Sequence, residues 1–341
     1  MNHFLIFCIT LKVTIFTQTL IGDRIGLNLR GMTGIVTKST GSRYLVRIDS
    51  GEVLDCVLKG KLRLDGRKTT NPVAVGDKVD IEREGEDTLI TKIHPRKNYI
   101  IRKSINLSKQ AQILASNLDQ AVLVATLVSP RTSLGFIDRF LITAEAYSIP
   151  AKIIFNKADI LDEESLKIQQ EIIDIYTKVG YDCLVVSSIN GKNLEKVKDL
   201  LKNKTTLVAG HSGVGKSTLI NAIEPTLKLK TGEISTAHSK GTHTTTFAEL
   251  HELSFGGYII DSPGIKELGL VEMKKEEVGH YFPEIRERMN DCKFNNCLHV
   301  NEPKCAIKDA VESGEISEER YTSYLGILTG EEMDWEEWEI K

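Results

Sequence analysis

The segment Gly-His-Ser-Gly-Val-Gly-Lys-Ser-Thr at positions 210–218 restricts the possible folds of this chain more than any other feature. It satisfies the spacing G-x-x-x-x-G-K-[ST], follows an apolar run at 206–209 and precedes a helical pattern at 216–223. Backbone N–H groups of such a loop surround phosphate oxygens, and the helix N-terminus favours negative charge. A glycine-rich turn without a ligand is the alternative. The complete match in this setting favours a phosphate-binding loop.

Specific roles follow for the last residues of this loop. Lys216 is expected to reach the outer phosphates of a nucleotide and to take part in catalysis, and Ser217 is expected to bind Mg²⁺. The predicted nucleotide-binding residues are Gly210, His211, Ser212, Gly213, Val214, Gly215, Lys216, Ser217 and Thr218.

A second motif, Asp-Ser-Pro-Gly at 261–264, follows the strand-like run at 258–260. Asp261 can hold Mg²⁺ through water, and the N–H of Gly264 can meet a γ-phosphate. An ordinary turn is the alternative. The position on a separate strand, downstream of Lys216, favours a nucleotide contact.

A third motif, Asn156-Lys157-Ala158-Asp159, follows the strand-like run at 151–155. A carboxylate there can accept two hydrogen bonds from the N1–H and N2–H₂ edge of guanine, which adenine lacks. The alternative is a helix start capped by Asp159. The phosphate loop favours guanine recognition, and two serines after the run at 183–186 can close over the base. These are Ser187 and Ser188, which are weak evidence alone.

The run Gly-Thr-His-Thr-Thr-Thr at 241–246 lies between the phosphate-loop helix and Asp261, where a switch loop belongs. A threonine in such a loop usually meets Mg²⁺ and the γ-phosphate. Thr244 and Thr245 are both candidates, and the sequence does not choose between them. A threonine-rich edge strand is the alternative.

Three cysteines and one histidine lie within the fourteen residues 292–305. Three thiolates and one imidazole form a closed tetrahedral set for one Zn²⁺, and such a site is structural because no ligand position is open. Buried free cysteines beside a surface histidine are the alternative. A disulfide framework is typical of smaller secreted chains, so a reducing cytosol is favoured. The predicted ligands are Cys292, Cys297, His299 and Cys305.

The chain divides into segments of different pattern. Its 341 residues suggest two or three domains, and 41% hydrophobic with 27% charged residues is a globular balance. No apolar run reaches the ~18 residues of a membrane span, which disfavours an integral membrane protein. Five short strand-like runs between 32 and 101 predict an OB-like or SH3-like barrel.

The barrel segment is basic, although the net charge of −3 gives no overall sign of a nucleic-acid partner. Residues 32–110 hold 16 Lys or Arg against 10 Asp or Glu. A basic OB-like barrel is typical of a nucleic-acid reader, and scattered solvated charge is the alternative.

Beyond about residue 110, strands alternate with helices, which predicts a mostly parallel sheet covered on both faces. From Lys274 the pattern is helical and polar, and it ends in an acidic tail. The expected strands are 121–128, 151–155, 183–186, 206–209 and 258–260, and the expected helices are 134–147, 164–179, 193–201 and 216–223.

The three nucleotide motifs look like those of GTPases in an unusual order, because the base-reading motif precedes the phosphate loop. With the leading barrel, the threonine-rich run and the cysteine cluster, the chain from Met32 to about Gly330 resembles the circularly permuted, ribosome-small-subunit-dependent GTPases, the RsgA or YjeQ family. This resemblance implies an OB-like barrel, a circularly permuted α/β P-loop GTPase domain and a helical zinc-binding domain. It also implies late maturation of the small ribosomal subunit as the function.

The resemblance further implies hydrolysis of GTP to GDP and phosphate with Mg²⁺, stimulated by the small subunit. Ile265 stands where Gln orients the attacking water in Ras-like enzymes. His243 is a candidate replacement, and a merely structural hydrogen bond is its alternative role. The implied partners are the small subunit, its rRNA and other assembly factors, for a cytoplasmic monomer without membrane contact.

Two other functions use the same motifs. A nucleotide-gated RNA-binding module needs GTP binding but not hydrolysis. A metabolic P-loop kinase is disfavoured by the motif at 156–159 and by the absence of an evident general base for a hydroxyl acceptor.

The expected domains include an N-terminal extension outside the resemblance. No Lys or Arg precedes Lys12 and no A-x-A cleavage site follows, so a signal peptide is disfavoured, and Met32 is an alternative start. The expected bounds are 1–31 for the extension, 32–108 for the barrel, 109–273 for the GTPase domain and 274–341 for the zinc-binding domain with its acidic tail.

Overall fold

A computed structural model describes residues 31–63, 72–103, 111–229, 248–261 and 273–330. The extension up to residue 30, the threonine-rich run, Gly264 and the acidic tail from 331 lie outside these described residues.

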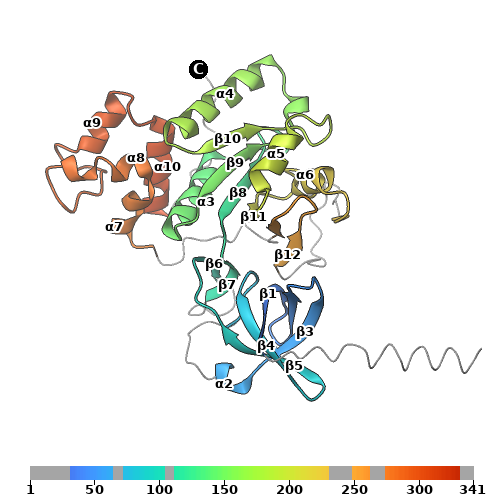
Figure 1. The fold of residues 1–341 in the computed structure, drawn as a ribbon. Coiled ribbons are helices and arrows are strands. Elements are labelled where there is room, and N and C mark those ends of the chain that lie inside the picture. Colours follow the sequence, from blue (N-terminus) through green and yellow to red (C-terminus); the bar gives the residue numbers. More distant parts are fainter. Residues whose placement is uncertain (1–30, 64–71, 104–110, 230–247, 262–272, 331–341) are drawn as a thin grey trace, which may run out of the picture.

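The N-terminal barrel forms as the sequence predicts (Figure 1). Apolar side chains alternate along its strands, as in β2, where Tyr44, Val46 and Ile48 are buried. The sheet closes because β1 pairs with both β2 and β4, and β3 pairs with β5. The strands are β1 (Met32–Ser39), β2 (Tyr44–Ile48), β3 (Val53–Leu58), β4 (Lys78–Glu84) and β5 (Asp87–Ile93), with helix α2 (Gly60–Arg63) after β3.

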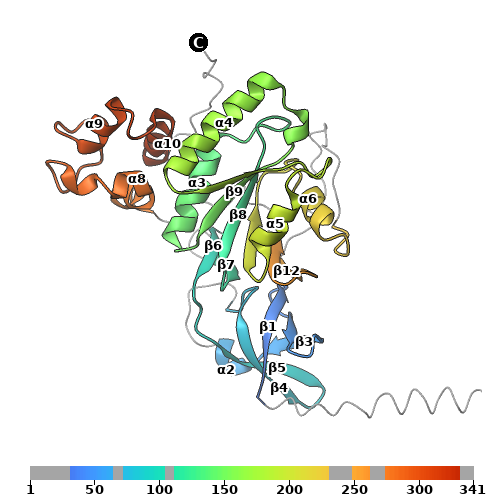
Figure 2. The same cartoon turned by 45° about the horizontal axis from the view of Figure 1, so that its top comes forward.

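The central domain contains a parallel sheet in the order β10-β9-β8-β11-β13. Helices α3 and α4 cover one face, and α5 and α6 cover the other (Figures 1 and 2). Its elements are β8 (Gln120–Ala125), α3 (Leu134–Ala146), β9 (Ala151–Phe155), the 3₁₀ turn η1 (Ala158–Ile160), α4 (Glu163–Lys178), β10 (Asp182–Val185), α5 (Leu194–Leu201), β11 (Thr205–Ala209), α6 (Lys216–Ile223) and β13 (Tyr258–Asp261).

Three strands were not among those expected. β6 (Tyr99–Lys103) and β7 (Ala111–Ser116) form an antiparallel pair after the barrel, and the expected boundary at 108/109 lies between them. β12 (Glu249–Glu252) is antiparallel to β13 and also pairs with β1. One sheet of eleven strands therefore runs from the central domain into the barrel.

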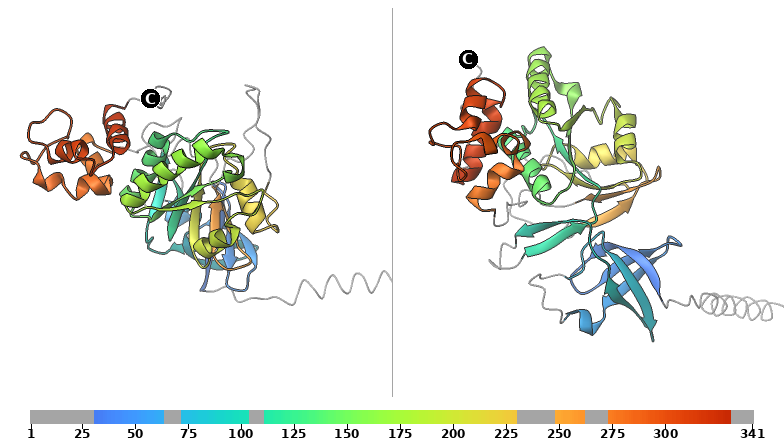
Figure 3. Two further views of the ribbon diagram at one scale, coloured as in Figure 1. Left: turned by 90° about the horizontal axis from the view of Figure 1, so that it is seen from above. Right: turned by 60° about the vertical axis from the view of Figure 1, so that its left-hand side comes forward.

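The C-terminal helices pack on α3 and lie apart from the barrel (Figures 1 and 3). Arg320 is buried at this contact and donates from Nη1 to Asp138 Oδ1 at 2.6 Å and from Nε to Glu284 Oε1 at 2.6 Å. None of the helices in the described part of the chain is both long and apolar enough to span a bilayer. The elements are α7 (Lys275–Val278), η3 (Gly279–Tyr281), α8 (Pro283–Arg286), η4 (Met289–Asp291), α9 (Ala306–Glu312) and α10 (Glu318–Thr329).

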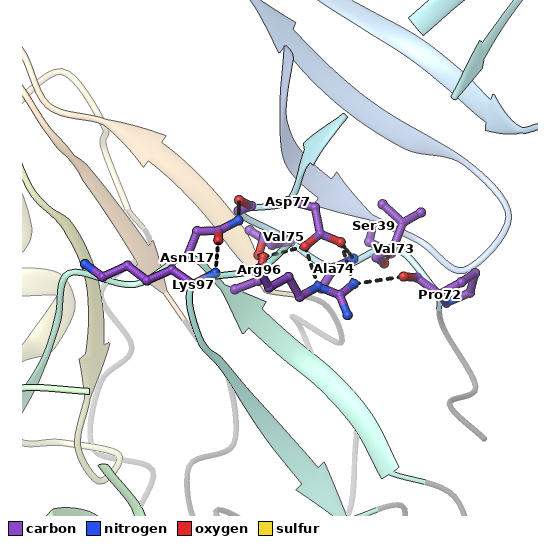
Figure 4. Close-up of polar contacts among 11 residues, drawn as sticks. Ser39, Pro72, Val73, Ala74, Val75, Asp77, Arg96, Lys97 and Asn117 are labelled. Carbon is purple, nitrogen blue, oxygen red and sulfur yellow. Dashed lines mark hydrogen bonds and ion pairs between the residues drawn. The ribbon is translucent and has the colours of Figure 1, made fainter. Parts of the chain in front are cut away.

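A buried carboxylate joins the barrel to the central domain (Figure 4). Asp77 is only 1% exposed. It accepts hydrogen bonds from Arg96 Nε and Nη2, both at 2.6 Å, and from Ser116 Oγ on β7 at 2.6 Å. The backbone N–H of Ala74 donates to the same carboxylate at 2.8 Å. A buried charge with this many donors is compensated, so the network fixes the junction.

Candidate functional site

The loop between β11 and α6 has a backbone that strongly favours glycine at several positions. Gly213 and Gly215 have φ values of 86° and 88°. A Cβ on Gly210 would meet the Val124 carbonyl oxygen at 2.3 Å, and one on Gly215 would meet Asn156 Nδ2 at 2.6 Å. The loop therefore lies tightly over the carboxyl ends of β8 and β9, as a phosphate-binding loop requires.

Lys216 begins α6 and turns its amine back over the loop. Its Nζ donates to the carbonyl oxygens of Gly210 at 2.6 Å and His211 at 2.9 Å. Burial lowers the pKa of Lys216, and the nearby Asp261 carboxylate opposes this shift. Burial raises the pKa of Asp261, and Lys216 opposes that rise. A cation and a carboxylate thus lie close enough to influence each other near the ends of β11 and β13.

Asn156 joins the base-reading motif to the phosphate loop. Its side chain is buried at the end of β9, and Nδ2 donates to the Val214 carbonyl oxygen at 2.9 Å. Its Oδ1 accepts hydrogen bonds from Ser188 N at 3.2 Å and Ser188 Oγ at 2.9 Å. Three separate predicted segments therefore meet at one side chain.

Asp159 is exposed beside these contacts, within η1. Its Oδ1 accepts a hydrogen bond from Ser187 Oγ at 2.5 Å, and Ser187 Oγ accepts one from Asn190 N at 3.2 Å. The N-cap of α4 is Asp162, whose side chain accepts from Ser165 N, so Asp159 does not cap that helix. An oriented, accessible carboxylate at this place can accept the paired N–H donors of guanine.

One contributing loop was missed in the sequence. Residues 129–132 follow β8, and Pro130 Cδ lies 3.2 Å from the position of a Cβ on Gly213. Lys157 Nζ donates to the Ser129 carbonyl oxygen, so the loop is tied to the base-reading motif. Thr126 Oγ1 also donates to the Pro130 carbonyl at 2.5 Å. Only spatial proximity identifies this loop, because its Ser-Pro sequence is an ordinary turn signal.

The remaining nucleotide-site predictions divide into two groups. Ser217 and Thr218 lie half-buried in the first turn of α6, beside Lys216. Four predicted residues lie outside the described residues: His243, Thr244, Thr245 and Gly264.

The four predicted metal ligands come together in the C-terminal domain, with ligand atoms all within 4.8 Å of one another. His299 Nδ1 lies 3.5 Å from Cys292 Sγ and 3.4 Å from Cys305 Sγ. Burial lowers the pKa of His299, which favours the neutral imidazole that metals bind. Together with Cys297, this cluster can hold a metal ion.

Neighbouring groups fix the loop that carries His299. Glu302 accepts hydrogen bonds from the backbone N–H groups of Leu298 and Val300, both at 2.9 Å. Two tyrosines of α10 donate to this loop from the other side. Tyr321 bonds the His299 carbonyl at 2.6 Å, and Tyr324 bonds the Leu298 carbonyl at 2.8 Å.

Family models match the barrel and the central domain of this chain. The family model of the RsgA GTPase matches residues 93–271, and that of the RsgA N-terminal domain matches residues 33–89. The small ribosomal subunit biogenesis GTPase RsgA of Christiangramia forsetii is 57% identical over 89% of this chain and 98% of that protein. The chain belongs to the RsgA GTPase family. The protein of the same name from Flavobacterium psychrophilum is 56% identical over 88% of this chain and 94% of its own.

Two solved structures are similar to this chain over most of its length and support its place in this family. YjeQ from Thermotoga maritima has a TM-score of 0.73 and 36% identity, covering 88% of this chain and 98% of that one. YloQ, a circularly permuted GTPase, has a TM-score of 0.69 and 32% identity, covering 90% and 97%. The expected permuted GTPase fold with a leading barrel is therefore confirmed, and this RsgA family member is a GTPase.

Proposed function

We propose that this protein hydrolyses GTP to GDP and phosphate with Mg²⁺ during late maturation of the small ribosomal subunit. The observation that carries the nucleotide part is the contact of Asn156 with both Val214 and Ser188, which assembles base-reading and phosphate-binding segments at one sheet edge. The names of the curated relatives, small ribosomal subunit biogenesis GTPases, support the biological part.

Different residues of the site would bind the phosphates, the guanine base and Mg²⁺. Backbone N–H groups of loop 210–218 and the Lys216 amine would hold the phosphates, and Asp159, whose carboxylate is fixed by Ser187, would accept the donors of guanine. Ser217 would hold Mg²⁺ directly and Asp261 would hold it through water, and the ion would supply positive charge to the phosphates. The sequence adds a switch threonine, Thr244 or Thr245, and the N–H of Gly264.

The attacking water needs a positioning group, and Ile265 cannot supply one because its side chain is apolar. His243 is our candidate for this role. With such an arrangement, we expect slow GTP hydrolysis by the isolated protein and a faster rate when it docks on the small subunit.

Zinc fits the metal-binding cluster. Tetrahedral coordination with Zn–S of ~2.3 Å and Zn–N of ~2.0 Å places two sulfurs ~3.8 Å apart and a sulfur ~3.5 Å from a nitrogen. Cys292 Sγ and Cys305 Sγ are 3.9 Å apart, and His299 Nδ1 is 3.5 and 3.4 Å from them. One Zn²⁺ with four protein ligands would be structural, since no position remains for a substrate.

The partner is the small ribosomal subunit, contacted through its rRNA by the basic barrel. Residues 32–110 carry an excess of Lys and Arg, and phosphate contacts supply sequence-independent affinity. We expect a cytoplasmic monomer that meets other assembly factors on the subunit.

Co-sedimentation tests this proposal. Purified small subunits should carry the protein into the pellet in the presence of a non-hydrolysable GTP analogue, and the amount bound should fall as salt rises. Equal recovery with small and large subunits, or no recovery with either, would overturn the assignment of the partner.

A further inference from the structure

Strand β12 connects the barrel to the nucleotide site. Glu249 is the cross-strand partner of Lys38 on β1 and of Asp261 on β13. These three residues therefore form one row across three strands, with Lys38 in the barrel and Asp261 at the nucleotide site. Side chains of such cross-strand partners project from the same face of a sheet.

Two ion pairs hold this short strand to the barrel. Lys38 Nζ lies 3.1 Å from Glu249 Oε2, and Arg47 on β2 pairs with Glu252. The pairs lie at the first and last residues of β12. Within the described residues, the ladder between β1 and β12 has a single residue pair, so side chains supply much of this junction.

An irregularity in β1 directs Lys38 toward β12. β1 pairs with β4 as far as Ile35, and its register with β2 shifts between Val36 and Lys38. Such a bulge bends the strand and redirects the following side chain. The end of β1 thereby leaves β4 and meets β12.

We propose that Glu249 and Glu252 are positioning residues, through which the barrel and the Mg²⁺-binding Asp261 influence each other. This inference rests on the proposed function, because it assigns the barrel to rRNA and Asp261 to the nucleotide. A displacement of β1 on RNA binding is carried by the ion pairs to β12 and by the β12–β13 ladder to Asp261. Coupling between two binding sites is reciprocal, so the bound nucleotide alters the affinity of the barrel for RNA.

The test measures the affinity of the full chain for small ribosomal subunits with GDP and with a non-hydrolysable GTP analogue. For the parent protein we expect the two affinities to differ by roughly 5- to 150-fold, the usual range of such coupling. Lys38→Gln and Glu249→Gln should each lower the ratio, and Lys38→Gln combined with Arg47→Gln, which breaks both ion pairs, should bring it close to one. Lys38→Gln combined with Glu249→Gln should lower the ratio no more than either single change, because these two residues act through one contact.

Two further variants show whether a changed affinity ratio comes from lost coupling, from lost charge or from unfolding. Arg43 Nε lies 2.8 Å from Asp55 Oδ2 on the surface of the barrel. Arg43→Gln therefore removes the same charge as Lys38→Gln without changing a contact to β12. The Arg43→Gln control should bind small subunits less tightly with either nucleotide, and its ratio of the two affinities should equal that of the parent protein. Lys38→Arg should restore the ratio, and exposed ion pairs contribute too little to stability to unfold any variant.

The outcomes distinguish this inference from the function on which it rests. A parent protein that binds no small subunits with either nucleotide overturns the proposed partner and the inference together. A parent that binds equally with both nucleotides overturns the inference alone. Lys38→Gln and Glu249→Gln variants that keep the same ratio as Arg43→Gln also overturn it.

Discussion

The Asn156 side chain donates a hydrogen bond to the Val214 carbonyl oxygen at 2.9 Å and so holds the base-reading motif against the phosphate loop. The two segments are separated by more than fifty residues in the sequence. Since Asn156 is buried, this contact sets the distance between the two ends of the nucleotide site before any ligand binds.

Replacing Asn156 by Ala tests this preorganisation. The buried carbonyl of Val214 would lose its donor, which costs about 1–3 kcal/mol of stability. GTP and GDP affinity should both fall, because the two halves of the site are no longer fixed. Titration with a fluorescent guanine nucleotide measures the effect. Asn290→Ala, an exposed change in the C-terminal domain, should keep the parent affinity, and an unchanged affinity in Asn156→Ala would contradict the preorganisation.

Asp159→Asn tests guanine recognition. The amide replaces one acceptor oxygen by a donor, so GTP affinity should fall by several kcal/mol, and xanthosine triphosphate should be preferred because its C2 oxygen accepts a hydrogen bond. Competition binding with both nucleotides measures the change. Asp162→Asn is the matched control, because Asn caps a helix about as well as Asp, so this change removes the same charge while α4 and the base site stay intact. Parent-like GTP affinity in Asp159→Asn would remove Asp159 from the site.

Local sequence pattern was sufficient to predict most of the central domain. The helix at 216–223 lies where its glycine-rich start places it, and the strand at 151–155 agrees with β9. Both depend on short-range features of the sequence. The helix start depends on glycines at positions with positive φ, and the strand depends on a continuous apolar run.

Long-range pairing was not predictable in the same way. β12 reads Glu-Leu-His-Glu and carries too little hydrophobicity to be identified as a strand. It forms because β1 and β13 flank it, which is a tertiary effect. The same holds for Pro130 beside Gly213 and for Arg320, whose two carboxylate partners lie in distant segments.

Removal of the metal should loosen the C-terminal domain selectively. Elemental analysis should find about one zinc per chain, and Cys305→Ser should lower that content, because the closed ligand set needs all four residues. Chelation should increase protease cleavage within 292–305 while guanine-nucleotide affinity is kept. Cys183→Ser, outside the cluster, is the control and should retain zinc. Metal-free protein with an equally protected C-terminal domain would contradict a structural zinc.

Arg320→Met should be one of the most destabilising single changes. It leaves Asp138 buried beside α10 without its cation, and breaking such a pair costs about 3–5 kcal/mol. Arg286→Gln breaks the more exposed pair with Glu145 and should cost less than about 1 kcal/mol. Urea denaturation of both variants gives the comparison. Equal stability of the two variants would show that the buried pair does not fix the C-terminal domain.

We propose that this GTPase works on the small ribosomal subunit. The most direct test of this proposal is the rate of GTP hydrolysis by the full chain with and without purified small subunits. With Ile265 in place of a polar water-positioning residue, we predict slow turnover alone and stimulation on the order of 10²-fold or more by small subunits. Large subunits at the same concentration should give no such gain. A rate of GTP hydrolysis that is the same with and without small subunits would contradict this proposal.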